Sequence, residues 1–212
     1  TQICRQLRGQ GYDDKVPSTH GVQIGHFELL PDTGHGATNA KLWDFGGQDI
    51  FYATHQFFLS EEAIYILAWT NYENVRVYLT QSDLPDNEKW RENGYWLENI
   101  RLHGKTSPIV MVQTHSDCRD NKLIPDPAFL QSPYQVTCID FSAKKQNGFG
   151  LEELKECIVD KLKTDIPLFG QSFPKSFEKV IQRMEESTDM VISLGEFYSI
   201  CASSGVLSGI EK

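Results

Sequence analysis

The stretch "DFGGQ" at residues 44–48 carries residue types that could bind a terminal phosphate and direct a water to it. Asp44 and Gly47 fit the pattern D-x-x-G, in which the carboxylate holds Mg²⁺ through water and the glycine amide meets a terminal phosphate. Gln48 would then be placed to orient an attacking water. A glycine-rich turn that leaves a strand has the same letters, so this motif alone leaves both interpretations open.

The stretch "THSD" at residues 114–117 ends in a carboxylate that could read a base. Asp117 can accept two parallel hydrogen bonds from N1 and N2 of guanine, which adenine cannot offer. His115, after Thr114, could lie along the base. In isolation the motif also fits an aspartate that caps a loop after a strand.

The stretch "SAK" comprises Ser142, Ala143 and Lys144 and follows the next apolar strand. The Ala143 amide could donate to guanine O6, while Ser142 shapes the loop. The motif is weak by itself, and its place after "THSD" gives it weight.

Gly104, Lys105 and Thr106 spell the end of a phosphate-binding P-loop, but their surroundings argue against that site. Asn99 occupies the position of the first glycine, and Pro108 with a β-branched strand follows where a helix would have to begin. We interpret these residues as a loop before a strand.

The elements that would position the motifs form an alternating pattern. Residues 22–29 and 40–45 have the composition of a strand hairpin around a turn at 31–39, and residues 61–70, 107–114 and 134–142 read as buried strands. Helical spacing is expected at residues 1–7, 87–103 and 150–162. Strands that alternate with helices predict an α/β fold with a parallel sheet, whose ligands sit at the carboxyl ends of the strands. All three motifs follow predicted strands.

Composition bounds the class of protein. The 212 residues are 40% hydrophobic, and the net charge of −9 argues against a nucleic-acid-binding face, which needs clustered Lys and Arg. The five cysteines are scattered and favour reduced thiols in a cytosolic protein. No apolar run is long enough to span a bilayer.

The order D-x-x-G, then T-H-x-D, then S-A-K resembles the Ras-like GTPases, and more closely the Roc domains of the Roco family. "LWDFGGQDIFYATHQFFL" at residues 42–59 is similar to a Roc switch II, with aromatic residues after the glutamine. Residues from about 167 to 206 are similar to the start of the COR domain that follows Roc. The resemblance predicts a Roc-like domain over residues 1–164 and the helical start of a COR-like domain over residues 165–212.

The resemblance implies hydrolysis of GTP to GDP with Mg²⁺, as a conformational switch in a cytoplasmic, multidomain signalling protein. Gln48 would position water, and the metal site would comprise Thr1, Thr19 (in "STHGV") and Asp44. The implied nucleotide-binding residues are Gly47, Thr114, His115, Asp117, Ser142, Ala143 and Lys144. The implied partners are GTP or GDP, the COR domain and other domains of the same chain, and a second copy through Roc-COR.

The N-terminal residues "TQICRQL" look like the segment directly after Gly-Lys of a P-loop, with Thr1 as its metal-binding hydroxyl. The first strand of the sheet, the phosphate-cradling amides and the P-loop lysine are then expected to be absent from the printed chain. The resemblance therefore assigns GTPase activity to the parent protein and leaves it open for this chain.

Two other classes stay open. An interaction or dimerisation module on the same fold would bind nucleotide weakly, and a P-loop ATPase is disfavoured by Asp117 and Ala143. No catalytic arginine can be assigned, since Arg5, Arg76 and Arg101 are candidates by their charge alone.

Overall fold

The computed structural model of the chain describes residues 1–30, 38–46, 56–70, 93–118, 135–144, 149–167, 169–170, 174–187 and 191–206. The chain divides into two compact units, Thr1–Phe169 and Gly170–Lys212. This division lies close to the predicted boundary after residue 164. The assignment of the two units to named domains stays a prediction.

The first unit begins with a short helix and a strand hairpin. Helix α1 spans Gln2–Leu7, and β1 (Val22–Leu30) pairs antiparallel with β2 (Thr38–Phe45). The predicted hairpin is confirmed, and β2 begins at Thr38, inside the segment predicted as a turn. Phe27 on β1 faces Ala40 on β2, and both pack on the core, because alternate residues of a strand point to one face.

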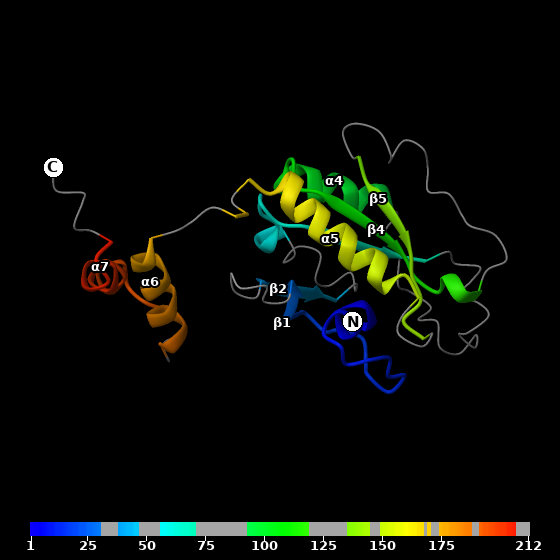
Figure 1. Cartoon of the computed structure of the whole chain (residues 1–212), viewed down its shortest axis with the longest axis horizontal. Coiled ribbons are helices and arrows are strands. Elements are labelled where there is room, and N and C mark those ends of the chain that lie inside the picture. Colours follow the sequence, from blue (N-terminus) through cyan, green and yellow to red (C-terminus); the bar gives the residue numbers. More distant parts are fainter. Residues whose placement is uncertain are drawn as a thin grey trace. The chain divides into compact units, whose positions relative to one another are not determined.

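The second part of this unit is a parallel sheet with helices on both faces, as predicted. Strands β3 (Tyr65–Trp69), β4 (Ile109–Gln113) and β5 (Thr137–Asp140) pair in the order β3-β4-β5. Helix α4 (Asn93–Gly104) and helix α5 (Leu151–Asp165) flank the sheet (Figure 1). Short 3₁₀ helices, η2 (Gln56–Phe58) and η3 (Ser116–Cys118), lie before β3 and after β4.

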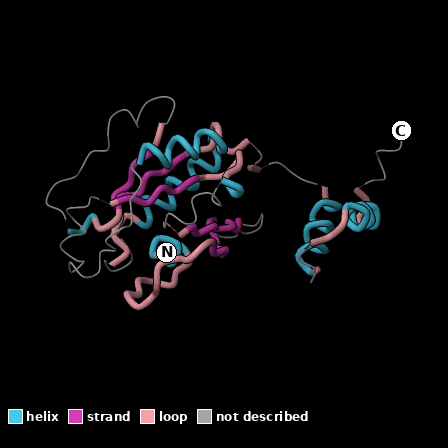
Figure 2. The backbone as a smooth tube through the Cα atoms, turned by 180° about the vertical axis from the view of Figure 1, so that it is seen from behind, coloured by secondary structure: helices cyan, strands magenta, loops and turns pink. Residues whose placement is uncertain are grey.

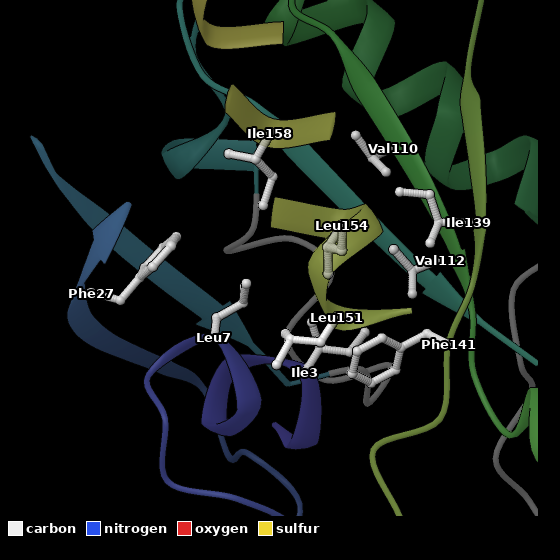
Figure 3. Packing of buried hydrophobic residues seen from close by; sticks show 10 residues of the cluster. All are labelled: Ile3, Leu7, Phe27, Val110, Val112, Ile139, Phe141, Leu151, Leu154 and Ile158. Atoms are coloured by element: carbon white, nitrogen blue, oxygen red, sulfur yellow. The ribbon is translucent and has the colours of Figure 1, made fainter. Parts of the chain in front are cut away.

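The central strand β4 explains the layering. Val110 and Val112 pack with α5, whereas Ile109 and Met111 pack with α4 on the opposite face, and all four side chains are buried. A strand covered on both faces reads as a continuous apolar run, which is why this segment was recognisable in the sequence. Figure 3 shows the apolar cluster that contains Val110 and Val112, with the apolar side chains of α1 beside those of α5.

The expectation that β3 is buried on both faces is wrong. Ala68 is exposed, and the other residues of the strand are partly exposed. The cause is topological, because β3 lies at an edge of the three-stranded sheet. The hairpin β1-β2 and this sheet are separate groups of hydrogen-bonded strands among the described residues (Figure 2).

The second unit contains a pair of helices, α6 (Lys175–Glu186) and α7 (Leu194–Ser203). Val180 and Cys201 are buried, and the Arg183 guanidinium donates to the Ser203 hydroxyl, which links the two helices. Helix α7 ends two residues before Gly205, which adopts φ +85°. Within the described part of the chain, no helix combines the length and apolar composition needed to cross a membrane.

Candidate functional site

Three residues predicted to bind metal converge in the structure. The Thr19 hydroxyl donates to Asp44 Oδ2 at 2.7 Å, and the amino nitrogen of Thr1 donates to Asp44 Oδ1 at 3.3 Å. The hydroxyls of Thr1 and Thr19 hydrogen-bond to each other, and the Thr19 amide donates to Thr1 Oγ1 at 3.1 Å. Thr19 is buried. Oxygen atoms from three separate segments therefore form one compact group.

The hairpin places Asp44 in this group. Asp44 is the penultimate residue of β2 and pairs with Gln23 of β1. The Gly46 amide donates to the Gly21 carbonyl at 2.8 Å and closes the open end of the hairpin beside the loop that carries Thr19. Thr1, in turn, is the N-cap residue of α1. The register of the hairpin and the start of the helix thus fix the group.

The chemistry of these donors fits Mg²⁺. This ion prefers oxygen ligands and keeps several waters, so a site with one carboxylate and hydroxyl groups suits it better than a nitrogen or sulfur site. No group of three or more His, Cys, Asp or Glu side chains that could hold a metal occurs among the residues that the structure describes. The metal-binding role of Thr1, Thr19 and Asp44 stays a prediction.

Cys4 lies beside the same carboxylate, that of Asp44. Burial raises the pKa of the Cys4 thiol to about 12, and the negative charge of Asp44 acts in the same direction. A thiol with this pKa is protonated at neutral pH, and the thiolate is the form that attacks substrates or binds metals.

The "THSD" residues follow the carboxyl end of β4. The amide and the hydroxyl of Thr114 both donate to the Trp69 carbonyl, at 2.8 and 3.1 Å, so this side chain ties the ends of β4 and β3 together. His115 is exposed and adopts φ +57°, a conformation uncommon for residues other than glycine. Asp117 lies in η3 and is partly exposed.

The "SAK" residues follow the carboxyl end of β5. Ser142 is buried, and its amide donates to the Phe149 carbonyl at 3.0 Å. Ala143 is partly buried and Lys144 is exposed. The Ala143 carbonyl accepts a hydrogen bond from the Gln6 side chain at 2.7 Å.

Ser116 joins the two loops. Its hydroxyl donates to the Gln113 carbonyl at 2.8 Å and accepts from the Phe141 amide at 3.1 Å. The Ser116 amide donates to the Phe141 carbonyl at 3.2 Å. The "THSD" and "SAK" residues thus lie next to each other at the carboxyl edge of the sheet, where the alternating pattern predicted a ligand.

Other predicted residues fall elsewhere. The phosphate-contacting Gly47 and the catalytic Gln48 lie outside the described residues, as does Arg76. Arg5 donates to the carbonyls of the loop that follows α1, and Arg101 donates to those of Lys105 and Ser107. Both arginines thus hold loops of the fold.

The Gly-Lys-Thr sequence forms a turn between α4 and β4, in agreement with its interpretation as a loop. The Gly104 carbonyl accepts from the Ser107 amide at 2.8 Å, and Lys105 forms an ion pair with Glu61. A Cβ atom on Gly104 would lie 2.7 Å from Tyr65 Cε2, so close packing against an aromatic ring accounts for this glycine.

Sequence reasoning missed the roles of Gln6 and Ser116. A signal existed for Gln6, because it lies between Ile3 and Leu7 near the apolar face of α1 and a buried polar side chain needs a partner. Its partner, Ala143, is distant in the sequence and could not be read from spacing. Ser116 occupies the variable position of "THSD", where its residue type carried no signal.

Comparisons with known proteins concern the chain as a whole. A family model described as "Ras of Complex, Roc, domain of DAPkinase" matches residues 1–117, which is more than half of the 212 residues. The match includes Thr1, Thr19 and Asp44, and it ends at Asp117.

Several curated relatives come from Dictyostelium discoideum. The probable serine/threonine-protein kinase roco5 is 26% identical over 89% of this chain and 7% of its own length. The probable serine/threonine-protein kinase qkgA is 31% identical over 71% of this chain and 9% of its own length. The chain therefore spans less than a tenth of the length of these relatives.

A solved structure extends the likeness beyond residue 117. The structure of Methanosarcina barkeri Roco2 RocCORdC, bound to GDP, is 26% identical and superposes with a TM-score of 0.73. The match covers 96% of this chain and 57% of that one. The family match, the Roco relatives and the shared Ras-like architecture show that the chain belongs to the Roc domains of the Roco family.

Proposed function

We propose that this chain binds guanine nucleotides and hydrolyses GTP to GDP as the switch domain of a cytoplasmic, multidomain Roco-type signalling protein. The observation that carries the proposal is the convergence of Thr1, Thr19 and Asp44 from three separate segments. A scaffold has no need to gather a carboxylate and two hydroxyls around one point. The GDP in the Roco2 relative supports the same ligand class.

In this proposal each end of the nucleotide has its own residues. Thr1, Thr19 and Asp44 hold Mg²⁺, which would neutralise the charge of the phosphate oxygens when bound. Asp117 accepts from N1 and N2 of guanine, and the Ala143 amide donates to O6. Thr114 and Ser142 shape these loops, while His115 and Lys144 border the base.

Hydrolysis is proposed to proceed by attack of water on the γ-phosphate. Gln48 positions that water and Gly47 contacts the phosphate, and both roles rest on the sequence motif. Electrostatic stabilisation of the transferred phosphoryl group would supply most of the catalysis, as in other phosphoryl-transfer enzymes.

Residues 165–212, which include the second unit, are proposed to be the start of a COR domain. Support comes from the Roco2 RocCORdC relative, whose match covers 96% of this chain and so includes most of these residues. A switch of this kind would act on the other domains of its own chain and on a second copy bound through Roc-COR.

An interaction module with little nucleotide affinity is the second candidate. One observation favours it: apolar side chains are exposed in both units. In the first unit these include Ile24, Trp43, Phe57 and Phe58, and in the second Phe177, Ile181 and Met184. Large exposed apolar groups are typical of surfaces that bind other proteins.

Titration with fluorescent GDP separates the two candidates. The chain as printed, and a chain with a strand and a Gly-rich loop ending in Gly-Lys added before Thr1, are titrated in Mg²⁺ with unlabelled GDP or ADP as competitor. The proposal expects binding by the extended chain that GDP displaces and ADP does not. An absence of binding by both chains would favour the interaction module, and displacement by ADP would favour an ATPase.

A further inference from the structure

A buried hydrogen bond connects the first helix to the "SAK" loop. The Gln6 side-chain nitrogen Nε2 donates to the Ala143 carbonyl at 2.7 Å, across 137 positions of sequence. Gln6 is only 7% exposed. Burying an amide costs free energy unless it is hydrogen-bonded, so this bond satisfies a group that packing alone would disfavour.

The helix that carries Gln6 is anchored on either side of it. Ile3 and Leu7 are buried in the same apolar cluster as Phe141 and Leu151 (Figure 3). Since these contacts fix the position of α1, the Gln6 amide is held at a defined place relative to the end of β5. An apolar residue at position 6 would serve the packing, and only a donor can hold the carbonyl.

The bond acts on the peptide unit beside the one that would read the base. The Ser142 amide donates to the Phe149 carbonyl at 3.0 Å on one side, and Gln6 holds the Ala143 carbonyl on the other. The peptide between these two anchors carries the Ala143 N–H. Because peptide units are planar and rigid, fixing both neighbours restricts the direction of this N–H.

We infer that Gln6 is a positioning residue for guanine recognition, which it serves by holding Ala143 so that the Ala143 amide meets guanine O6. The inference rests on the proposed function. It also gives α1 two roles. Thr1, at the start of the helix, belongs to the group of oxygen atoms around Asp44, and Gln6, in the last turn, holds the "SAK" loop. A Gln6 with a merely structural role would stabilise the fold without regard to the base.

A comparison of two ligands distinguishes these roles. GDP and 6-thio-GDP share N1–H and the amino group, and differ in the acceptor at position 6, where sulfur accepts hydrogen bonds weakly. Affinities are measured for the wild type, Gln6→Leu and the matched control Gln2→Leu, in the form of the chain that binds GDP in the titration above. Gln2 belongs to the same helix, but its side chain donates to the Asp13 carbonyl at 2.8 Å and not to the "SAK" loop.

For Gln6→Leu we expect about tenfold weaker binding of GDP, which corresponds to the loss of one hydrogen bond. Binding of 6-thio-GDP should weaken by less than about twofold, because its sulfur accepts little from the Ala143 amide. Gln2→Leu should leave the ratio of the two affinities at its wild-type value. Equal losses for both ligands, or no loss, would overturn the inference while leaving the proposed function in place. Failure of the wild type to bind GDP would instead remove the proposed function, and the inference with it.

A measurement without nucleotide checks the structural half of the inference. Hydrogen exchange at the Ser142 amide, which is bonded to Phe149, should quicken in Gln6→Leu and stay at the wild-type rate in Gln2→Leu. An unchanged exchange rate in Gln6→Leu would show that the loop holds its position without Gln6, and would overturn the inference.

Discussion

Asp44 concentrates the proposed chemistry of the metal site in a single carboxylate. Its two oxygens face different partners, Thr19 and the amino nitrogen of Thr1. Replacing it with Asn keeps the shape and one acceptor but removes the negative charge that a divalent cation requires.

For Asp44→Asn we therefore expect GDP affinity in Mg²⁺ to fall by about tenfold or more, the equivalent of ~1.4 kcal/mol, and to become insensitive to EDTA. Asp13→Asn is the matched control, because this carboxylate is partly exposed and lies 3.9 Å from Arg5, outside the proposed metal site. Fluorescent-nucleotide titrations with and without EDTA measure the effect. An EDTA response of wild-type size in Asp44→Asn would contradict the assigned role.

Gly150 sets the start of α5 through both its backbone and its lack of a side chain. It adopts φ +79°, and a Cβ atom there would lie 2.0 Å from the Asp140 carbonyl oxygen. Gly11 has φ +70° with nothing within 4 Å of such a Cβ. The two positions share the backbone conformation and differ in available space.

Gly11→Ala should therefore lower the free energy of unfolding by about 1–2 kcal/mol, the cost of a left-handed conformation. Gly150→Ala should lower it by a further ~2 kcal/mol or more, because backbone at the end of β5 must also move. Urea unfolding of both variants measures the difference. Equal losses would mean that the close approach to Asp140 is relieved without cost.

Helix α7 carries a reciprocal cap at its first turn. The Glu196 amide donates to Ser193 Oγ at 3.2 Å, and the Ser193 amide donates to Glu196 Oε2 at 2.7 Å. The second bond favours the charged carboxylate and lowers the pKa of Glu196 below its ordinary value of 4.5. A lowered pKa means that the cap stabilises the helix above pH 4.5 and is lost as pH falls through the folded-state pKa.

We expect the Ser193 amide chemical shift to titrate with a midpoint below pH 4.5 in the wild type. In Glu196→Gln the side chain keeps an acceptor and cannot ionise, so the same shift should stay constant with pH. Nuclear magnetic resonance across pH 2–7 measures both. A wild-type midpoint at or above 4.5 would contradict the cap.

At the scale of helices and strands, the sequence predicted an element correctly where its apolar pattern matched the burial of its faces. The apolar run of β4 was recognised because both of its faces are covered. The similar apolar run of β3 led to a wrong prediction of burial, because an apolar strand can also lie at the edge of a sheet. The order of strands in a sheet cannot be read from any one segment. Phe177, Ile181 and Met184 recur at helical spacing along α6, yet all three side chains are exposed.

In the whole molecule, the proposed base site depends on connections that join distant parts of the chain. "THSD" and "SAK" were visible as motifs because each is contiguous, and the parallel sheet predicted that they meet. The bonds of Ser116 to Phe141 and of Gln6 to Ala143 were not visible, because each joins residues far apart in sequence. The spacing of residues in a sequence can predict which residues contact a ligand. The groups that hold those residues in place can be identified only from the tertiary structure.

The central claim is that the molecule selects guanine through Asp117. Xanthine carries an oxygen in place of the guanine amino group, so an Asn side chain, which can donate, should pair with it better than a carboxylate does. The decisive measurement is the ratio of the dissociation constants for GDP and xanthosine diphosphate, in the wild type and in Asp117→Asn, using the form of the chain that binds GDP. We predict that the wild type prefers GDP, and that the variant shifts the ratio toward xanthosine diphosphate by about tenfold to a hundredfold. An unchanged ratio would contradict the account, because the base would then be read by other residues or not at all.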